Sequence, residues 1–199
     1  AAPVALNDYE RQGGRVRFAS DGTPRRFHAA TTAGLRQPAA ITPVPGGDLR
    51  DLPGGADLII VTVPQFRAAL EPLVAARQKQ GLRVAVVDVE QIYDTFSAGE
   101  PGPEAIRAFV QYARAYWPAP APRYLLLAGD ASYDPLGYLG GAELDRIPTQ
   151  LMHTVFSGWT ASDVWYALPD DTAEALPALA VGRMPAQTPE QLATMVAKT

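Results

Sequence analysis

The chain has 199 residues, of which 47% are hydrophobic and 19% charged, so it can build a core of ordinary size and is not a disordered protein. Its 17 basic and 21 acidic residues give a net charge of -4, which disfavours nucleic-acid binding because such proteins usually carry a basic excess. The absence of cysteine excludes disulfides, thiolate metal ligands and a cysteine nucleophile within these residues. No apolar run reaches the roughly 18 residues of a membrane span, and no signal peptide is visible.

The first section of the chain, residues 1–55, has the pattern of a small β-structure. Polar and apolar residues alternate in Arg15–Ala19 and in Arg26–Ala29, as they do in half-buried strands. Between them, Ser20–Pro24 is rich in turn-forming residues. We therefore predict that residues 1–55 form a β-hairpin arm followed by a linker rich in proline and glycine.

From residue 56 onward, apolar strands alternate with helical patterns. Continuous apolar runs at Leu58–Val63, Arg83–Val89 and Arg123–Ala128 are typical of strands that are buried on both faces of a parallel sheet. The stretches between them have helical spacing, and Pro103 suits the first turn of the second helix. Right-handed crossovers between such strands produce a doubly wound sheet, so we predict an α/β fold with helices on both faces.

The last part of the chain contains shorter elements. Two further strands are predicted at Val164–Leu168 and Ala178–Val181, and a final helix begins at Pro189 with Thr188 as its N-cap. No strand follows this helix. We therefore expect residues 56–199 to be an α/β subdomain that is cut before its fold is complete, with a sheet edge or a helix-packing face left uncovered.

Candidate site residues follow from the rule that doubly wound sheets carry their sites at the carboxyl ends of the strands. Asp130 and Asp134 follow the third strand and could bind a hard cation such as Ca²⁺, which prefers oxygen ligands. Alternatively, Asp130 accepts N–H groups of its own loop and Asp134 is solvated. Asp163 is either a cap or a support for that loop. His153 could reach a cleft at this edge or be an ordinary histidine, and His28 lies on the predicted hairpin.

Several catalytic and cofactor motifs are missing. Gly129-Asp130-Ala131-Ser132 is not the Gly-x-Ser-x-Gly turn that exposes a serine nucleophile. No Gly-x-Gly-x-x-Gly follows the first strand, and the phosphate-binding P-loop motif is absent, so we expect no nucleotide cofactor. These residues alone assign no catalytic group.

A series of landmarks between about residue 56 and residue 198 resembles the gingipain-type cysteine peptidases. The most distinctive is Ile92-Tyr93-Asp94-x-Phe96-Ser97-x-Gly99, followed by Ala105-Ile106-Arg107-x-Phe109. The others, in chain order, are Ala56-Asp57-Leu58-Ile59-Ile60-Val61, Arg77-x-x-x-Gly81-Leu82-x-Val84, Tyr124-Leu125-Leu126-Leu127-x-Gly129-Asp130-x-Ser132-Tyr133-Asp134, Ile147-Pro148-Thr149, Thr160-Ala161-Ser162-Asp163 and Ala180-x-Gly182-Arg183-x-Pro185. The resemblance implies a caspase-like α/β fold.

The resemblance also implies that the catalytic residues lie in another subdomain. In this family the catalytic histidine, in a His-Gly pair, and the catalytic cysteine belong to a second subdomain that follows the region matched here. This chain has neither, so it is similar only to the first, supporting subdomain. No catalytic residue is transferred, His153 included, and we expect no hydrolysis by the chain alone.

Further properties follow from the resemblance only. They are structural Ca²⁺, which favours a site at Asp130, and a secreted or cell-surface location. They also include, as partner, the catalytic subdomain of the same parent protein, which would act on peptide substrates. The alternative is a non-catalytic interaction or assembly module with the same fold, and a nucleotide- or phosphate-binding domain of flavodoxin type is a third possibility. The parent's sequence discriminates the first two, because a peptidase must continue into a His-Gly pair and a cysteine.

Overall fold

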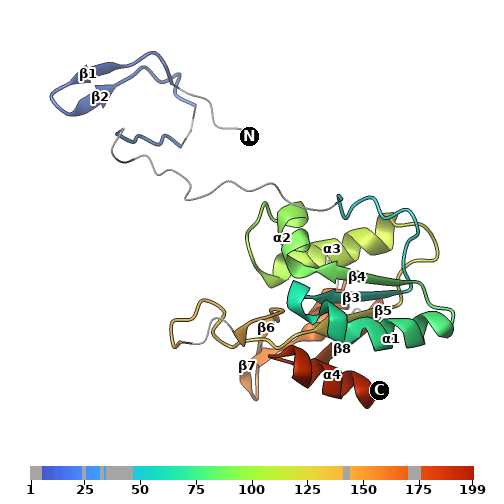
Figure 1. Cartoon of the computed structure of the whole chain (residues 1–199). Helices are drawn as coiled ribbons and strands as arrows, with labels where there is room; N and C mark the ends of the chain where they lie inside the picture. Colours follow the sequence, from blue (N-terminus) through green and yellow to red (C-terminus); the bar gives the residue numbers. More distant parts are fainter. Residues whose placement is uncertain (1–5, 24–25, 32–33, 35–46, 141–143, 170–175) are drawn as a thin grey trace. The chain divides into compact units, whose positions relative to one another are not determined.

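The computed structural model describes residues 6–23, 26–31, 34, 47–140, 144–169 and 176–199 (Figure 1). The chain divides into two compact units, residues 1–42 and residues 43–199. In the second unit, Leu49 and Leu52 pack against the core, and the indole N–H of Trp117 donates to the Leu49 carbonyl at 2.9 Å. No helix within the described ranges combines the length and apolarity that crossing a bilayer requires.

The first unit contains an antiparallel hairpin, but its strands are not the pair predicted. Strands β1 (Glu10–Gln12) and β2 (Arg15–Arg17) pair across Gly13 and Gly14. Both glycines have positive φ, 55° and 78°, as a tight two-residue turn requires. The predicted strand at residues 26–29 is wrong, because that segment has no regular structure and contacts the hairpin's continuation through Phe27 and Phe18, whose ring centroids are 4.6 Å apart. Part of the predicted turn, residues 24 and 25, lies outside the described residues.

The second unit is built on a parallel sheet, as predicted, and this sheet has a fourth strand beside the three of the predicted core. Its strands are β3 (Leu58–Thr62), β4 (Val84–Asp88), β5 (Tyr124–Ala128) and β8 (Ala180–Met184), in the order β4-β3-β5-β8. Every residue of β3 is buried, which explains why this strand is an unbroken run of β-branched and leucine side chains. The fourth strand corresponds to the predicted strand at residues 178–181, displaced toward the C-terminus.

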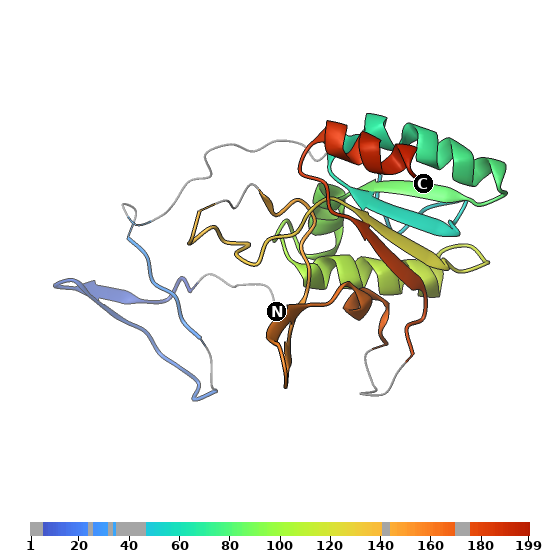
Figure 2. The ribbon, with the colours of Figure 1, turned by 90° about the horizontal axis from the view of Figure 1, so that it is seen from below.

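Two helices cover each face of this sheet. On one face lie α1 (Arg67–Lys79), preceded by the 3-10 turn η2 (Pro64–Phe66), and α4 (Pro189–Ala197). On the other face lie α2 (Val89–Phe96) and α3 (Pro103–Tyr116). Figures 1 and 2 show the two pairs on opposite sides of the strands. This is the layering that the alternation of strands and helices predicted.

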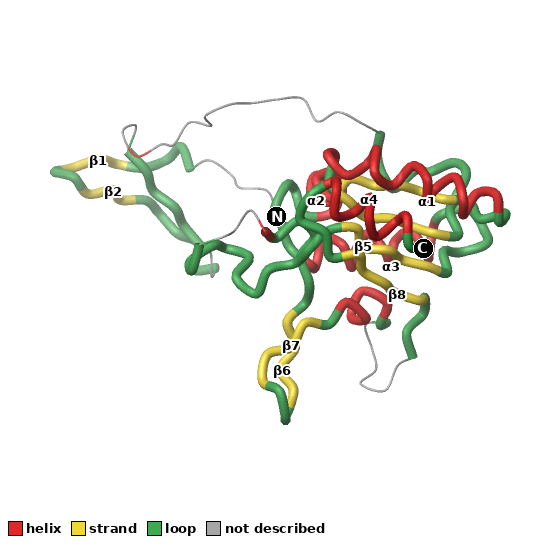
Figure 3. Tube along the Cα trace, turned by 60° about the horizontal axis from the view of Figure 1, so that its bottom comes forward, coloured by secondary structure: helices red, strands yellow, loops and turns green. Residues whose placement is uncertain are grey.

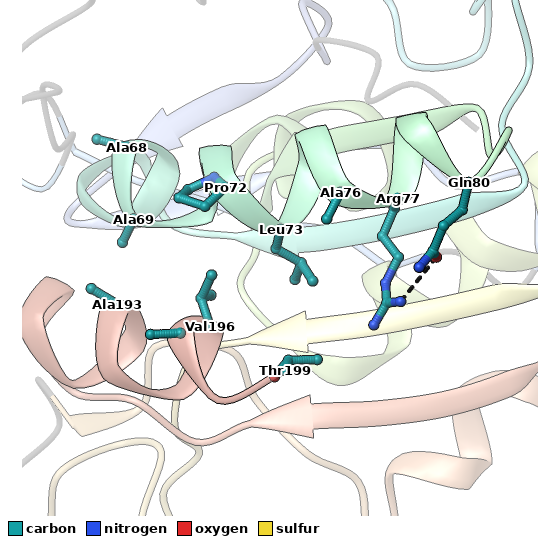
Figure 4. Close-up of a pocket in the computed structure, with 11 residues that line it drawn as sticks. Ala68, Ala69, Pro72, Leu73, Ala76, Arg77, Gln80, Ala193, Val196 and Thr199 are labelled. Carbon is teal, nitrogen blue, oxygen red and sulfur yellow. Dashed lines mark hydrogen bonds between the residues drawn. The ribbon is translucent and has the colours of Figure 1, made fainter.

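The helix ends follow the sequence closely. Pro103 is the first residue of α3, and the Thr188 hydroxyl accepts the N–H of Gln191 at 3.3 Å as the N-cap of α4. Helix α1 runs through Pro72 as a single element. In Figure 4, Leu73 of α1 and Val196 of α4 point into the space between the two helices, where a groove of about 320 Å³ remains.

The region between β5 and β8 differs most from the prediction. It contains a hairpin, β6 (Leu151–Thr154) with β7 (Gly158–Ala161), that no sequence pattern indicated. The predicted strand Val164–Leu168 is wrong, because residues 163–167 form the 3-10 helix η4 (Asp163–Ala167). A helical turn buries Tyr166 and Ala167 together, whereas a strand would point these neighbours to opposite faces. The Tyr166 hydroxyl also donates to the Pro148 carbonyl at 2.6 Å.

Candidate functional site

The carboxyl ends of the four parallel strands meet at one edge of the sheet. The register aligns Thr62 with both Asp88 and Ala128, the last residues of β4 and β5, and Ala128 with Met184 of β8. Thr62 is fully buried, and its hydroxyl donates to the Ala128 carbonyl at 3.1 Å. The predicted site residues lie in the loops that leave this edge.

Asp130 follows β5 almost directly and joins two of these loops. Its Oδ1 accepts the N–H of Ala131 at 2.9 Å, and its Oδ2 accepts the side-chain amide of Gln187 at 3.0 Å. Its backbone N–H donates to the Ala186 carbonyl at 2.9 Å, and its carbonyl accepts the N–H of Ile147 at 3.0 Å. Asp130 therefore ties the segment after β5 to the segment after β8.

Asp134 closes a turn of its own loop. Its Oδ2 accepts the N–H of Leu139, and its N–H donates to the Ser132 hydroxyl at 3.0 Å. Across the ranges that the structure describes, no three histidine, aspartate or glutamate side chains converge as metal ligands. Since the carboxylates of Asp130 and Asp134 face N–H donors, their arrangement does not fit a calcium ion held between them. Calcium binding stays a prediction.

Asp163 is one half of an ion-pair cluster that we call the Arg183 cluster. The Arg183 guanidinium donates to both oxygens of the Asp163 carboxylate at 2.7 Å, and the Thr149 hydroxyl donates to one of them at 2.8 Å. The same guanidinium also donates to three backbone carbonyls, those of Gly129 (2.8 Å), Ile147 (2.7 Å) and Pro148 (3.1 Å). Arg183 thus fastens the loops after β5 to strand β8.

The Arg183 cluster is largely shielded from solvent. The Arg183 side chain is 12% exposed and that of Asp163 is 25% exposed. Burial by itself raises the pKa of Asp163, but the hydrogen bonds and the charge of Arg183, with the Thr149 hydroxyl, outweigh it and hold that pKa below its ordinary value. Asp163 is therefore ionised at neutral pH and makes the contacts of a residue that supports the Asp130 loop.

Asp145 belongs to the same region, although no sequence pattern singled it out. Its Oδ1 accepts the N–H of Ser132 at 2.8 Å. Burial raises the pKa of the Asp145 carboxyl, and the charge of Asp130 adds to that rise, while the Ser132 hydrogen bond and Arg183 oppose it. Burial, followed by the charge of Asp145, also raises the pKa of Tyr93. These shifts indicate that Asp145 and Tyr93 are both partly desolvated.

His153 does not join these groups. It lies on β6, and its ring is 5.5 Å from that of Trp159, its cross-strand partner on β7. In the described parts of the chain, no carboxylate or hydroxyl forms a hydrogen bond with His153, whereas a catalytic histidine needs such a partner. His28 belongs to the other compact unit.

The sequence model of peptidase family C25 matches residues 51–199. No curated protein matches. Among solved structures, latent dimeric PorU from Porphyromonas gingivalis is 29% identical to this chain with a TM-score of 0.59, and the match covers 72% of this chain and 15% of that chain.

Two other solved structures have the same fold. The complex of the pro- and mature domains of RgpB from Porphyromonas gingivalis is 20% identical with a TM-score of 0.53, covering 71% of this chain and 27% of that chain. A structure described only as a protease is 21% identical with a TM-score of 0.52, covering 76% of this chain and 28% of that chain. This chain therefore spans less than a third of the length of each of the three. Since the family model matches most of its residues, from 51 to 199, the chain belongs to peptidase family C25, the gingipain family.

Proposed function

We propose that this chain is the supporting, non-catalytic subdomain of a gingipain-like cysteine endopeptidase. In the parent protein it would hold a second, catalytic subdomain in place and form part of the wall of the peptide-binding cleft. The parent would act outside the cell or on its surface, as the gingipain resemblance implies.

The observation that carries this proposal is the absence of cysteine from a chain that belongs to a cysteine peptidase family. A cysteine peptidase needs a thiolate nucleophile and a histidine that accepts or donates its proton. This chain has two histidines, in different compact units, and neither is followed by glycine. The side chains at the carboxyl edge instead bind one another and the backbone, as Asp130 and Asp163 do.

The lateral edge of the sheet, along β8, supports the same proposal. Strand β8 pairs with β5 and with no other strand in the described ranges, so the outer backbone groups of β8 are available to a neighbour. A Cβ on Gly182 would meet nothing within 4 Å, so a face of the sheet is also open at this strand. A following subdomain could pack along β8, which would cover the kind of uncovered sheet edge that the sequence predicted.

The proposal is tested first by hydrolysis. We expect the purified chain, with calcium and a thiol reductant, to leave fluorogenic peptides that end in arginine, in lysine or in apolar residues uncleaved. Turnover that disappears in His153→Ala but persists in His28→Ala would contradict the proposal, because the chain would then have a catalytic group of its own.

The parent protein supplies the second test. The proposal expects a His-Gly pair and a cysteine beyond this segment, and it expects peptidase activity that is lost when residues 43–199 are deleted. A parent without these residues would favour the alternative, an interaction or assembly module with the same fold.

Structural calcium is a separate proposal that rests on the gingipain resemblance, and it requires the Asp130 and Asp134 carboxylates, which accept N–H donors here, to bind the ion instead. A calcium ion that binds only the folded chain and is present at a concentration of 100 times its Kd would stabilise the fold by about 2.7 kcal/mol, which a thermal melt detects. An increase in Tm with calcium that is abolished in Asp130→Asn would establish the site. A melt that calcium leaves unchanged would remove calcium from the proposal.

A further inference from the structure

A groove lies between the β6–β7 hairpin and the loop that follows β5. It has a volume of about 410 Å³, and it is lined by Tyr133, Asp134, Tyr138, Leu139, Leu151 and Trp159. Figure 3 shows the β6–β7 hairpin projecting away from the helices that flank the sheet. We call this hollow the hairpin groove.

The apolar side chains of the hairpin groove are unusually exposed. Tyr138 is 84% exposed, Leu139 81% and Trp159 62%. At the tip of the hairpin, Val155 and Phe156 are almost wholly exposed. Large apolar side chains that gather on one exposed surface are typical of a binding site, and tryptophan and tyrosine contribute most to such sites.

The charge of this region narrows the class of partner. Residues 147–162 contain no aspartate, glutamate, lysine or arginine, and Asp134 is the one charged side chain that lines the groove. An anionic lipid surface or a nucleic acid would require basic side chains, which the lining lacks. The partner should therefore be uncharged or apolar where it enters the groove.

The backbone of the hairpin indicates the conformation of the partner. Among the described strands, β6 pairs with β7 alone and β7 with β6 alone, so each keeps an outer edge with which no strand pairs. On the outer edge of β6, the Leu151 carbonyl accepts the side-chain amide of Gln150 at 3.1 Å. The register places Leu151, His153 and Trp159 on one face of the hairpin, and Leu151 and Trp159 line the groove. An extended peptide could pair with a free edge while its alternate side chains lie in the groove.

We propose that the hairpin groove binds an extended peptide through apolar or aromatic side chains that stack on Trp159 and Tyr138. This inference rests on the proposed function, because the substrate of a peptidase is itself a peptide that is bound in extended form. It assigns to this chain a subsite that selects an apolar residue of the substrate. Asp134 in the lining disfavours acidic residues there by like-charge repulsion.

The test uses the intact chain, labelled with ¹⁵N, and three unlabelled octapeptides followed by NMR. One peptide alternates phenylalanine with threonine, a second alternates glutamate with threonine, and the third is the phenylalanine peptide with alternate backbone nitrogens methylated. We expect the first peptide alone to shift amide signals, and we expect the shifts to be confined to residues 133–139 and 151–161.

Two variants and a matched control test whether Trp159 and Tyr138 bind the peptide. Trp159→Ala and Tyr138→Ala should each raise the Kd of the phenylalanine peptide by about tenfold or more, as loss of an aromatic binding residue usually does. Tyr138 is so exposed that its replacement should leave the fold intact even if Trp159→Ala does not. Tyr116→Ala, which removes a tyrosine on α3 that is 70% exposed, should change nothing.

Several outcomes would overturn the inference. They are no binding of the phenylalanine peptide, equal binding of the glutamate or the N-methylated peptide, or shifts centred elsewhere on the chain. Self-association of the chain that Trp159→Ala abolishes would assign the groove to a second copy instead. Failure here leaves the supporting role intact, because that role is tested separately by hydrolysis and by deletion in the parent.

Discussion

Two arginines stabilise the loops at opposite ends of the parallel strands in a similar way. At the amino ends of the strands, Arg83 precedes β4 and forms what we call the Arg83 cluster. Its side chain donates to Asp57 at 3.0 Å, and its backbone N–H donates to the same carboxylate at 2.9 Å. The Arg83 guanidinium also donates to the carbonyls of Gly54 (3.0 Å) and Pro120 (2.7 Å). At the carboxyl edge, the Arg183 cluster has the same composition of one arginine, one aspartate and several backbone carbonyls.

The two clusters differ in exposure and in what they hold. The Arg83 side chain is 33% exposed, against 12% for Arg183, whereas the side chain of Asp57 is 9% exposed, against 25% for Asp163. Arg83 secures connections at the edge away from the candidate site, whereas Arg183 holds the loops that carry Asp130 and Asp163. Water reaches the position of the Arg83 side chain more easily than that of Arg183, and Asp57 keeps the Arg83 backbone N–H as a donor when the side chain is removed. The Arg183 cluster should therefore be the more costly to break.

The largest effect should come from Arg183→Ala. This change leaves the Asp163 carboxylate without its ion-pair partner, with the Thr149 hydroxyl still donating to it, and removes the guanidinium from the Ile147 carbonyl. We expect a loss of about 3–5 kcal/mol in the free energy of unfolding. That corresponds to a decrease of about 6–20 °C in Tm for a chain of this size. Urea denaturation and a thermal melt would measure both.

Two control variants sharpen this prediction. Arg183→Lys keeps the charge but not the forked set of donors, so its loss should be intermediate. Arg67→Ala breaks the Arg67–Asp88 pair, in which Arg67 is 44% exposed, and should cost about 0–1 kcal/mol. Equal losses for Arg183→Ala and Arg67→Ala would contradict the role that we assign to burial.

A second change tests the packing beneath the Arg183 cluster. Gly129 has φ of 153°, and a Cβ on it would lie 2.7 Å from Cγ1 of Ile147 and 3.0 Å from Cβ of Arg146. Gly129→Ala should therefore cost about 2–4 kcal/mol through backbone strain and overpacking. Gly182→Ala is the matched control, because a Cβ there meets nothing within 4 Å, and its stability should be close to wild type.

Arg83→Ala should have a smaller effect than either. Water reaches the Arg83 side chain, and the buried Asp57 carboxylate keeps the Arg83 backbone N–H as a donor, so we expect a loss of about 1–2 kcal/mol, measured by the same urea denaturation. A loss as large as that of Arg183→Ala would remove the distinction between the two edges of the sheet.

The smallest effect is the change in the free energy of unfolding at acidic pH. Hydrogen bonds from Arg83 hold the pKa of Asp57 below its ordinary value, and the pKa of Asp163 is also lowered. Such groups stabilise the fold above their unfolded pKa of about 3.9, and this contribution is lost as pH falls through the lower folded pKa. Stability should thus decline below about pH 4, and less steeply in Asp57→Asn and Asp163→Asn.

Asp145 provides a control, because its effect on the pH dependence of stability has the opposite sign. Because burial raises its pKa, protonation of Asp145 favours the folded state, and this contribution is lost as pH rises through the folded pKa. Asp145→Asn should therefore be at least as stable as wild type at neutral pH and lose its advantage in acid. Urea denaturation at several pH values between about 2.5 and 7 would measure all three variants.

Local patterns predicted much of the second unit. The apolar runs of β3, β4 and β5 identified strands that are buried on both faces, and Pro103 and Thr188 identified the starts of two helices. Asp130 and Asp163 were selected because strand ends carry sites, and their contacts lie at that edge. The family was also recognisable from short motifs spread along the chain. Each of these features depends on residues that are close in sequence.

Contacts between distant segments decided the rest. The sequence placed Arg183 in a family landmark without giving it a role, and it did not single out Asp145. Their partners, Asp163 and Ser132, are brought near only when β8 and the intervening loops are in place. The predicted strand at residues 164–168 failed because burial of Tyr166 beside the Pro148 carbonyl favours a helical turn. The exposed face of the hairpin groove likewise depends on how a loop lies against β6 and β7. Hydrophobic periodicity records which side chains are buried locally, but only the folded chain determines which distant groups meet.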